Sequence, residues 1–393
     1  MSDGIVIAGG GLAAQRCCET LRRHGFDGRI RIVCEEERAP YDRPPLSKDV
    51  LSGERDPATL NFRPLGWYRE HDVELLPGER AVALDPGINT LTLASGPTLR
   101  YEAAVIATGS RPRKLPGTEQ FPNAHTLRTT EDAMRLRDAL RPGSRLIVVG
   151  AGFIGLEVAA TARQMGVEVT VLEAAPAPLL RVLGPSLAEW FVKLHRAEGV
   201  EVMLSAHVAR FGEGPAGAEW VQLTDGRQIE CDELVIGIGI KPAAEWLEGS
   251  GLDPEGVKAD PTGRTEAPDV YAAGDAARPF NPATGDHERS EHWEAAARQG
   301  AQVARAIIGL EPTTPALPSF WTDQYGLRVQ LVGDAREADQ IEIDGDPDAR
   351  DFTALMIRGA TPIAGMAVGR PRALPALREQ IETATTSAGE EQR

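Results

Sequence analysis

Two glycine-rich turns constrain the fold of this chain more than any other feature of its sequence. Each turn follows a short apolar strand and opens a helix rich in small residues, and a second apolar strand follows each helix. The first such unit spans residues 5–35 and the second spans residues 145–173. A strand, a tight turn, a helix and a further strand form a parallel βαβ unit. Because the unit occurs twice, the sequence predicts an α/β fold with two Rossmann-like dinucleotide-binding domains.

The first turn has the pattern G-x-G-x-x-A, with its small residues at Gly9, Gly11 and Ala14. In such a turn the first glycine makes the tight bend, the second lets the backbone approach a pyrophosphate, and the small third residue packs the helix against the strand. The phosphate then lies at the N-terminus of a helix, where free amides favour an anion. Glu35 ends the following strand, where a carboxylate can accept a ribose hydroxyl. The turn therefore predicts a dinucleotide site.

The second turn carries the fuller G-x-G-x-x-G pattern at Gly150, Gly152 and Gly155. Glu173 closes the strand that follows. A carboxylate at this position bonds the 2′-hydroxyl of the ribose and repels a 2′-phosphate, so we expect NADH to be preferred to NADPH. Arg181 lies further along the chain and is either a pyrophosphate contact or a solvated side chain.

Composition narrows the class of protein further. The chain has 393 residues, hydrophobic residues make up 42% of it and charged residues 25%, as in an ordinary globular protein. The longest apolar runs, such as residues 146–149, are far shorter than the ~20 residues that cross a bilayer, and the N-terminus shows no secretory signal. A formal net charge of −16 argues against nucleic acid as a partner. We expect a cytoplasmic protein that binds neither nucleic acid nor membrane.

The four cysteines show none of the spacings that a thiol relay needs. Cys17 and Cys18 are adjacent in the first helix, Cys34 ends a strand and Cys231 stands alone. Disulfide reductases of similar layout use a C-x-x-x-x-C or a C-x-x-C pair, and neither occurs. The seven histidines lack metal-ligand spacing. We therefore expect neither a reactive cysteine pair nor a metal site.

Several motifs, taken together, resemble those of one family. Residues 40–48, PYDRPPLSK, are similar to the P-Y-x-R-P-P-L-S-K signature of the FAD-dependent ferredoxin reductases that serve aromatic-ring dioxygenases and bacterial cytochromes P450. Residues 320–325, FWTDQY, resemble the F-W-S-D-Q-Y motif of the same family. Shorter matches follow in family order at residues 107–112, 127–129, 150–157, 273–275 and 291–293. The family is related in fold to apoptosis-inducing factor and to glutathione-reductase-like flavoproteins.

The resemblance also implies a division of the chain. An FAD-binding domain would comprise residues 1–112 and 241–316, with an NADH-binding domain inserted at residues 113–240. A C-terminal domain would span residues 317–393. Its alternating apolar residues at 327–331 and 341–343, followed by helical spacing from Leu374 to Ile381, predict an antiparallel sheet with a terminal helix.

On matching positions the resemblance implies site residues. Gly11, Leu12 and Ala13 would wrap the FAD pyrophosphate, and Glu35 would contact the adenosine ribose. The remaining implied FAD contacts are Arg43 at a phosphate, Lys48 at the isoalloxazine, the Ala81 backbone at the adenine, Arg128 and Asp275 at the phosphate–ribityl region, and Trp293 and Trp321 beside the flavin ring. The implied NADH contacts beyond the glycines and Glu173 are Phe153, Ile154, Gly239 and Glu291.

Lys48 and Glu157 form a separate predicted constellation, since the family has a Lys–Glu pair beside the flavin N5. A positive charge there would stabilise the anionic reduced flavin electrostatically. The implied function is a ferredoxin–NAD+ reductase: hydride passes from NADH to FAD, and single electrons then pass to a ferredoxin-type iron–sulfur protein that feeds an oxygenase. Two alternatives stay open. One is a rubredoxin reductase or NADH oxidase-like diaphorase, and the other is a redox-responsive NADH-binding protein like apoptosis-inducing factor.

Overall fold

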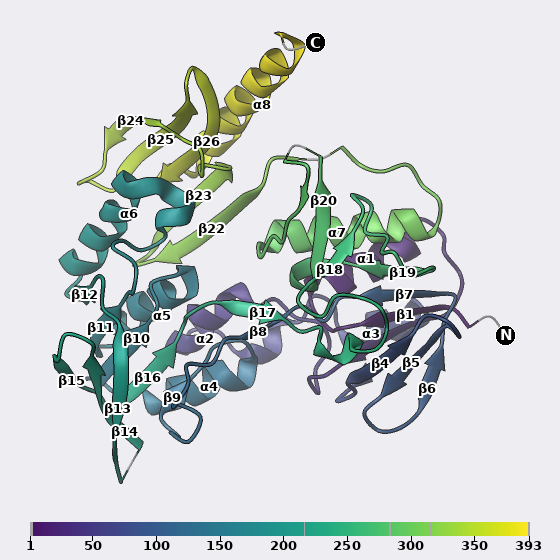
Figure 1. The fold of residues 1–393 in the computed structure, drawn as a ribbon, viewed down its shortest axis with the longest axis horizontal. Coiled ribbons are helices and arrows are strands. Elements are labelled where there is room, and N and C mark those ends of the chain that lie inside the picture. Colours follow the sequence, from purple (N-terminus) through teal and green to yellow (C-terminus); the bar gives the residue numbers. More distant parts are fainter. Residues whose placement is uncertain (1–2, 216, 283, 315, 392–393) are drawn as a thin grey trace. The chain divides into compact units, whose positions relative to one another are not determined.

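The computed structural model describes residues 3–215, 217–282, 284–314 and 316–391 (Figure 1). The chain forms two compact units. The first comprises residues 1–42, 58–111 and 240–316, and the second comprises residues 43–57, 112–239 and 317–393. Each unit is described by itself.

The first unit is built on a parallel sheet with the strand order β19-β7-β1-β2-β3. Its strands are β1 (Ile5–Ala8), β2 (Ile30–Cys34), β3 (Val73–Pro77), β7 (Ala103–Ile106) and β19 (Val270–Ala272). Side chains alternate across this sheet, so Ile5 and Ile7 face one layer and Val6 and Ala8 face the other. Every residue of β1 is buried, as expected of a parallel strand that is covered on both faces.

Two helices cover one face of this sheet and an antiparallel meander covers the other (Figure 1). The helices are α1 (Leu12–Arg23) and α7 (Trp293–Ile307), which pack against each other. The meander consists of β4 (Ala81–Asp85), β5 (Thr90–Leu93) and β6 (Thr98–Arg100). Smaller elements complete the unit: η2 (Pro57–Leu60), α3 (Leu65–Glu70), η3 (Glu245–Leu247), β18 (Val257–Ala259), η4 (Gly274–Ala276), β20 (Ala277–Asn281) and β21 (Asp286–His287).

The second unit repeats this plan. Its parallel sheet has the order β12-β11-β10-β16-β9, formed by β9 (Ala124–His125), β10 (Arg145–Val149), β11 (Glu168–Leu172), β12 (Glu201–Met203) and β16 (Glu233–Ile236). Helices α5 (Phe153–Gln164) and α6 (Leu180–Ala197) pack against its strands. An antiparallel meander again shares a hydrophobic core with the sheet; its strands are β13 (Val208–Gly214), β14 (Gly217–Leu223) and β15 (Gln228–Glu230).

The second unit also contains the C-terminal part of the chain and a short early segment. The C-terminal antiparallel sheet has the order β22-β23-β26-β25-β24, and helix α8 (Leu374–Glu391) packs on β26 and β23. Its strands are β22 (Ser319–Gln324), β23 (Leu327–Gly333), β24 (Gln340–Asp346), β25 (Asp351–Arg358) and β26 (Thr361–Val368), and η5 (Pro371–Ala373) precedes α8. The early segment forms η1 (Pro44–Ser47) and α2 (Asp49–Ser52), which lie against α4 (Thr130–Ala139) and α5.

The predicted α/β class, the two βαβ units and the antiparallel C-terminal sheet are all confirmed. Residues 233–236 form a core strand, β16, and the short β17 (Ile240–Pro242) pairs with β8 (Ser110–Pro112). In the part of the chain described above, no helix combines the length and the apolar character that a membrane span requires.

Candidate active site

The glycine turn of the first unit has two kinds of glycine. Gly9 has a φ of +123°, and a Cβ added there would lie 2.1 Å from the Ala107 carbonyl oxygen, so only glycine fits the close approach of two loops. Gly11 is the N-cap of α1, and a Cβ added there would meet none of the described atoms within 4 Å. The open side of Gly11 is therefore a space at the positive end of a helix, as a phosphate requires.

Small residues let α1 and α7 approach each other closely behind this turn. A Cβ added at Gly300 of α7 would lie 2.2 Å from the carbonyl oxygen of Ala13, and one added at Gly274 would lie 3.2 Å from the Ala13 methyl group. Ala14 is fully buried beside it, and Leu12 is the first residue of the helix. The small residues of the fingerprint thus have a packing role that the sequence pattern predicts.

Glu35 lies at the carboxyl end of β2 and pairs with a cation. Arg111 donates from Nη2 to both Glu35 oxygens, at 3.0 and 2.9 Å, and both side chains are partly exposed. The neighbouring Glu36 accepts a hydrogen bond of 2.6 Å from the Tyr41 hydroxyl. An arginine of the same unit therefore orients Glu35.

Other predicted FAD contacts of the first unit lie at the ends of buried elements. Asp275, in η4 after β19, accepts a hydrogen bond of 2.7 Å from Ser110 Oγ. Trp293 begins α7 and donates from Nε1 to Asp42 Oδ1 at 2.7 Å. Ala81 begins β4 and is buried.

Glu291, a predicted NADH contact, is exposed and paired with Arg289 at 2.6 Å. It belongs to the first unit, whereas the other predicted NADH contacts belong to the second.

The glycine turn of the second unit is built in the same way. A Cβ added at Gly150 would lie 2.4 Å from the Gly237 carbonyl oxygen, and one added at Gly155 would lie 2.2 Å from the Gly150 carbonyl oxygen. Gly152 is the N-cap of α5, and none of the described atoms lies within 4 Å of a Cβ added there. The same open space at a helix N-terminus therefore occurs twice.

Glu173 is held by the turn that it follows. Its Oε2 accepts a hydrogen bond of 2.7 Å from the amide of Ala151, and its Oε1 accepts one of 2.8 Å from the amide of Ala175. Each oxygen of an ionised carboxylate has more than one acceptor site, so ribose hydroxyls can still bind. The carboxylate is thus oriented beside Gly152 before any nucleotide arrives.

The remaining predicted NADH contacts of the second unit take different positions. Phe153 and Ile154 open α5; the Phe153 ring packs against Phe320 with centroids 4.9 Å apart, and Ile154 is exposed. Gly239 has a φ of +100° and accepts a 2.9 Å hydrogen bond from the Arg113 amide. The side chain of Arg181 lies outside the described part of the chain.

Two predicted phosphate contacts, Arg43 and Arg128, meet in the second unit although they are far apart in sequence. The Arg43 guanidinium donates from Nη1 to the Arg128 carbonyl oxygen at 2.6 Å. Asp132 holds the backbone at Arg128 in place, since its Oδ2 accepts hydrogen bonds from the amides of Arg128 and Thr129 at 3.0 Å each. The Arg43 guanidinium therefore lies beside the Arg128 backbone, just before the start of α4.

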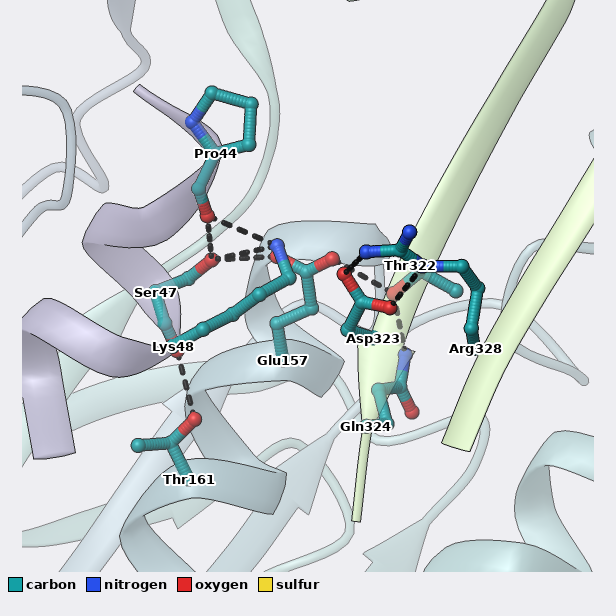
Figure 2. A network of polar contacts seen from close by, with 9 residues as sticks. All are labelled: Pro44, Ser47, Lys48, Glu157, Thr161, Thr322, Asp323, Gln324 and Arg328. Atoms are coloured by element: carbon teal, nitrogen blue, oxygen red, sulfur yellow. Dashed lines mark hydrogen bonds and ion pairs between the residues drawn. The ribbon is translucent and has the colours of Figure 1, made fainter. Parts of the chain in front are cut away.

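Lys48 and Glu157 form the ion pair that the sequence predicts (Figure 2). Lys48 Nζ lies 2.7 Å from Glu157 Oε2 and donates a second hydrogen bond of 2.9 Å to the Pro44 carbonyl oxygen. Glu157, in α5, is only 5% exposed. Glu157 Oε2 also accepts from Ser47 Oγ, and Glu157 Oε1 accepts from Thr322 Oγ1 at 2.7 Å. The buried Glu157 carboxylate thus accepts hydrogen bonds from three donors.

Sequence reasoning missed several members of these clusters. Ser47, Thr322 and Arg111 all lie inside the quoted motifs, but no role was expected of them. Their positions could have indicated a role, because each residue lies in a family motif. Ser47 adjoins Lys48, Thr322 adjoins Trp321, and Arg111 lies within residues 107–112. Trp321 itself is partly buried in β22, next to Thr322.

All four cysteines are buried free thiols. Burial raises the pKa of Cys18, Cys34 and Cys231 to about 12 each, and burial also raises that of Cys17. A thiol in this state lacks the thiolate that exchange chemistry needs. Across the described residues, no three His, Cys, Asp or Glu side chains are grouped so that they could hold a metal ion.

Comparisons with known proteins agree with this geometry. Residues 3–300 match the family described as pyridine nucleotide-disulphide oxidoreductase, and residues 319–391 match the one described as reductase C-terminal. The chain is 41% identical over 341 residues to the benzene 1,2-dioxygenase system ferredoxin–NAD(+) reductase subunit of Pseudomonas putida, covering 85% of this chain and 81% of that one. It is 36% identical over 383 residues to the anthranilate 1,2-dioxygenase system ferredoxin–NAD(+) reductase component of Burkholderia cepacia, covering 97% and 94%.

A solved structure is similar along nearly the whole chain. The reductase in the covalent putidaredoxin reductase–putidaredoxin complex superposes with a TM-score of 0.93 at 32% sequence identity, covering 97% of this chain and 93% of that one. Two glycine turns, each followed by an acid at the end of the next strand, define an oxidoreductase with two dinucleotide-binding folds.

The chain belongs to the pyridine nucleotide-disulphide oxidoreductase family, and within it to the ferredoxin–NAD(+) reductases. It is an enzyme, a flavoprotein oxidoreductase that uses FAD and NADH, and its partners are ferredoxin-type iron–sulfur proteins. The predictions of family, enzyme class, cofactors and partner class are confirmed. The residues present fit both cofactors, because each unit has one glycine whose Cβ position is open space at a helix N-terminus.

Proposed function

We propose that the first unit binds FAD at the turn containing Gly9 and Gly11, and that the second unit binds NADH at the turn containing Gly150 and Gly152. In domain terms, residues 1–112 and 241–316 would bind FAD, residues 113–240 would bind NADH, and residues 317–393 would form the C-terminal domain. The observation that carries this proposal is the open helix N-terminus in each unit. Glu35, Asp275 and Trp293 support the first site, and Glu173 supports the second.

FAD, when bound, accepts hydride from NADH and gives up electrons singly to an iron–sulfur protein. The protein's own contribution is alignment and charge. Lys48 supplies a fixed cation beside the isoalloxazine, and Glu157 and the Pro44 carbonyl hold its ammonium group in place. Arg43 and Arg128 supply positive charge for the phosphates. None of these residues needs to act as a nucleophile or as a general acid.

The ion pair can be tested directly. Lys48→Met removes the cation and keeps the length of the side chain, and we expect the rate at which NADH bleaches the flavin absorbance to fall by at least about tenfold. Glu157→Gln, which keeps the shape and removes the charge, should change the same rate and the flavin midpoint potential. Unchanged rates and potentials in both variants would refute the assignment of this pair.

We further propose a cytoplasmic protein whose acceptor is a ferredoxin that feeds a cytochrome P450 or an aromatic-ring dioxygenase. The relatives named above belong to dioxygenase systems, and the four thiols are free, as in a reducing compartment. The test is steady-state turnover with NADH against ferredoxins, rubredoxins and oxygen, compared by kcat/KM. Preference for a rubredoxin or for oxygen would overturn the proposed acceptor and leave the cofactor sites intact.

A further inference from the structure

A buried chain of hydrogen bonds runs from the end of α6 to Glu157, and the reaction described so far does not use it. The Tyr325 hydroxyl lies 2.8 Å from His195 Nδ1, and His195 Nε2 lies 2.8 Å from Gln324 Oε1. Gln324 Nε2 lies 3.0 Å from Thr322 Oγ1, which lies 2.7 Å from Glu157 Oε1. Figure 2 shows the half of this chain nearest Glu157.

Strand β22 makes this connection possible. Successive side chains of a strand point to opposite faces, so Thr322 and Gln324 lie on one face and Asp323 lies on the other. Asp323 pairs with Arg328 at 2.7 Å (Figure 2). Thr322 and His195 are 0% exposed and Gln324 is 2% exposed. A strand of the C-terminal sheet thus links two helices, α5 and α6, through buried polar atoms.

The Glu157 carboxylate at one end of the chain determines which group donates and which accepts in every hydrogen bond. An ionised carboxylate only accepts, so Thr322 donates to Glu157 and must accept from the Gln324 amide. The Gln324 carbonyl oxygen then accepts from His195 Nε2–H, which leaves Nδ1 as the acceptor of the Tyr325 hydroxyl. All donors therefore point toward Glu157, and hydrogen bonds aligned in this way strengthen one another.

We propose that Thr322, Gln324 and His195 are positioning residues that hold the Glu157 carboxylate in the one orientation that fixes Lys48 beside the flavin. This inference rests on the proposed function of the Lys48–Glu157 pair. An amide does not pass on a proton as a hydroxyl or imidazole does, so Gln324 makes the chain an orienting device and not a proton path. The C-terminal domain thereby contributes to the electrostatics of the flavin site through Thr322.

The state of His195 agrees with this direction. Burial lowers the pKa of His195 to about 4, in spite of its hydrogen bond to Gln324, so the ring is neutral near pH 7. A neutral ring has one donor and one acceptor nitrogen, as the chain requires. The geometry makes Nε2 the protonated nitrogen.

The first test reads the tautomer, independently of turnover. In ¹⁵N-histidine-labelled holoenzyme we expect His195 to show the shifts of a neutral ring with the proton on Nε2 at pH 7. In Gln324→Leu that preference should weaken, because the Nε2 acceptor is lost. A ring protonated at Nδ1 in the wild type would reverse the chain and overturn the proposal.

The second test is a double-mutant cycle on the FAD-loaded enzyme. Thr322→Val removes the donor at nearly constant shape, and we expect flavin reduction by NADH to slow by about three- to tenfold with little change in KM for NADH. Thr322→Ser keeps the hydroxyl and should restore the rate. Asp323→Asn, on the opposite face of the same strand, is the matched control and should leave the rate within about twofold.

The Glu157→Gln background separates positioning from general structural damage. In the Glu157→Gln background, Thr322→Val should change the rate of flavin reduction by less than about twofold and should hardly change the flavin midpoint potential. The reason is that the carboxylate that Thr322 orients is gone. Suppose that Glu157→Gln alone changes the rate of flavin reduction. Equal effects of Thr322→Val in both backgrounds, or no effect in either background, would then overturn the inference. Glu157→Gln and Lys48→Met both without effect would refute the proposed role of the Lys48–Glu157 pair, and the positioning role with it.

Discussion

The two glycine turns have the same backbone plan, but the acids that accompany them are held differently. Glu173 is bound by the amide of Ala151, inside its own glycine turn. Glu35 is bound by Arg111, which lies in β8, far from the first turn in sequence. The second acid is therefore oriented by the turn itself, and the first by a side chain from another part of the unit.

This difference fits the two cofactors. In the proposed function NADH leaves after each turnover and must be selected anew each time, and a carboxylate that backbone amides have already oriented would do this without rearrangement. In the proposed function FAD stays bound, so its ribose contact does not have to select a cofactor in each turnover.

The largest effect should come from the first glycine of each turn. In Gly9→Ala the new Cβ would lie 2.1 Å from a backbone oxygen at a φ of +123°, so we expect unfolding to become easier by at least about 2–4 kcal/mol and FAD to be lost. Gly11→Ala has a φ of −98° and open space, so FAD-free protein should keep its Tm and yet bind FAD at least about tenfold more weakly. Thermal unfolding with and without FAD distinguishes the two. Equal Tm losses in both variants would contradict the division into a structural and a ligand-facing glycine.

Glu173→Ala should narrow the preference for NADH over NADPH. The hydrogen bond to the ribose and the repulsion of a 2′-phosphate together should favour NADH by a few kcal/mol. At ~1.4 kcal/mol per factor of ten, this is a preference for NADH over NADPH of roughly tenfold to several hundredfold. Most of the change should appear in KM, as measured by steady-state kinetics with both nucleotides. Glu35→Ala is the matched variant of the other unit and should leave the nucleotide preference unchanged. A wild type that uses both nucleotides equally would show that Glu173 does not select.

Acid should weaken the second unit earlier than the first. His195 has an ordinary pKa of 6.5 when unfolded and about 4 when folded, so the unfolded chain binds the extra proton between these values. Stability therefore falls as the pH drops from about 6.5 to 4, by roughly 3 kcal/mol in full. Burial also lowers the pKa of the half-buried His292 in the first unit. His195→Gln isolates the larger contribution and should flatten the pH dependence of unfolding.

In the first unit, Glu19 affects stability in a lower pH range than His195 does in the second unit. Burial raises its pKa, but hydrogen bonds from Gln15, Arg63 and Arg16 outweigh this and hold the pKa below its usual range. Its contribution to stability is fully present above the unfolded pKa of 4.5 and is lost as the pH falls below that value and through the lower folded pKa. Hydrogen exchange from pH 7 to 4 should therefore show the second unit opening first. Simultaneous opening of both units would contradict this order.

Local rules predicted the parts of this molecule that local sequence determines. The βαβ units, the two open glycines and Glu173 follow from strand, turn and helix within about 30 residues. The Lys48–Glu157 pair joins residues 109 apart and was expected only through resemblance to a family. Thr322 and His195 escaped prediction, because their roles depend on how β22 packs between α5 and α6, and no short pattern encodes that packing.

Removing the cysteines should affect the two units unequally while leaving electron transfer largely intact. Cys17, Cys18 and Cys34 are buried in the core of the first unit, and Cys231 is buried in the core of the second. Replacing all four by Ala leaves small cavities that cost about 1 kcal/mol each, so most of the stability loss should fall on the first unit. Turnover must therefore be normalised to FAD-loaded protein. Because the buried thiols stay protonated, we expect flavin reduction by NADH and electron delivery to ferredoxin to persist within about twofold. Fast flavin reduction combined with a collapse of delivery to ferredoxin would show that a cysteine carries electrons, and the direct route from flavin to iron–sulfur protein would then be wrong.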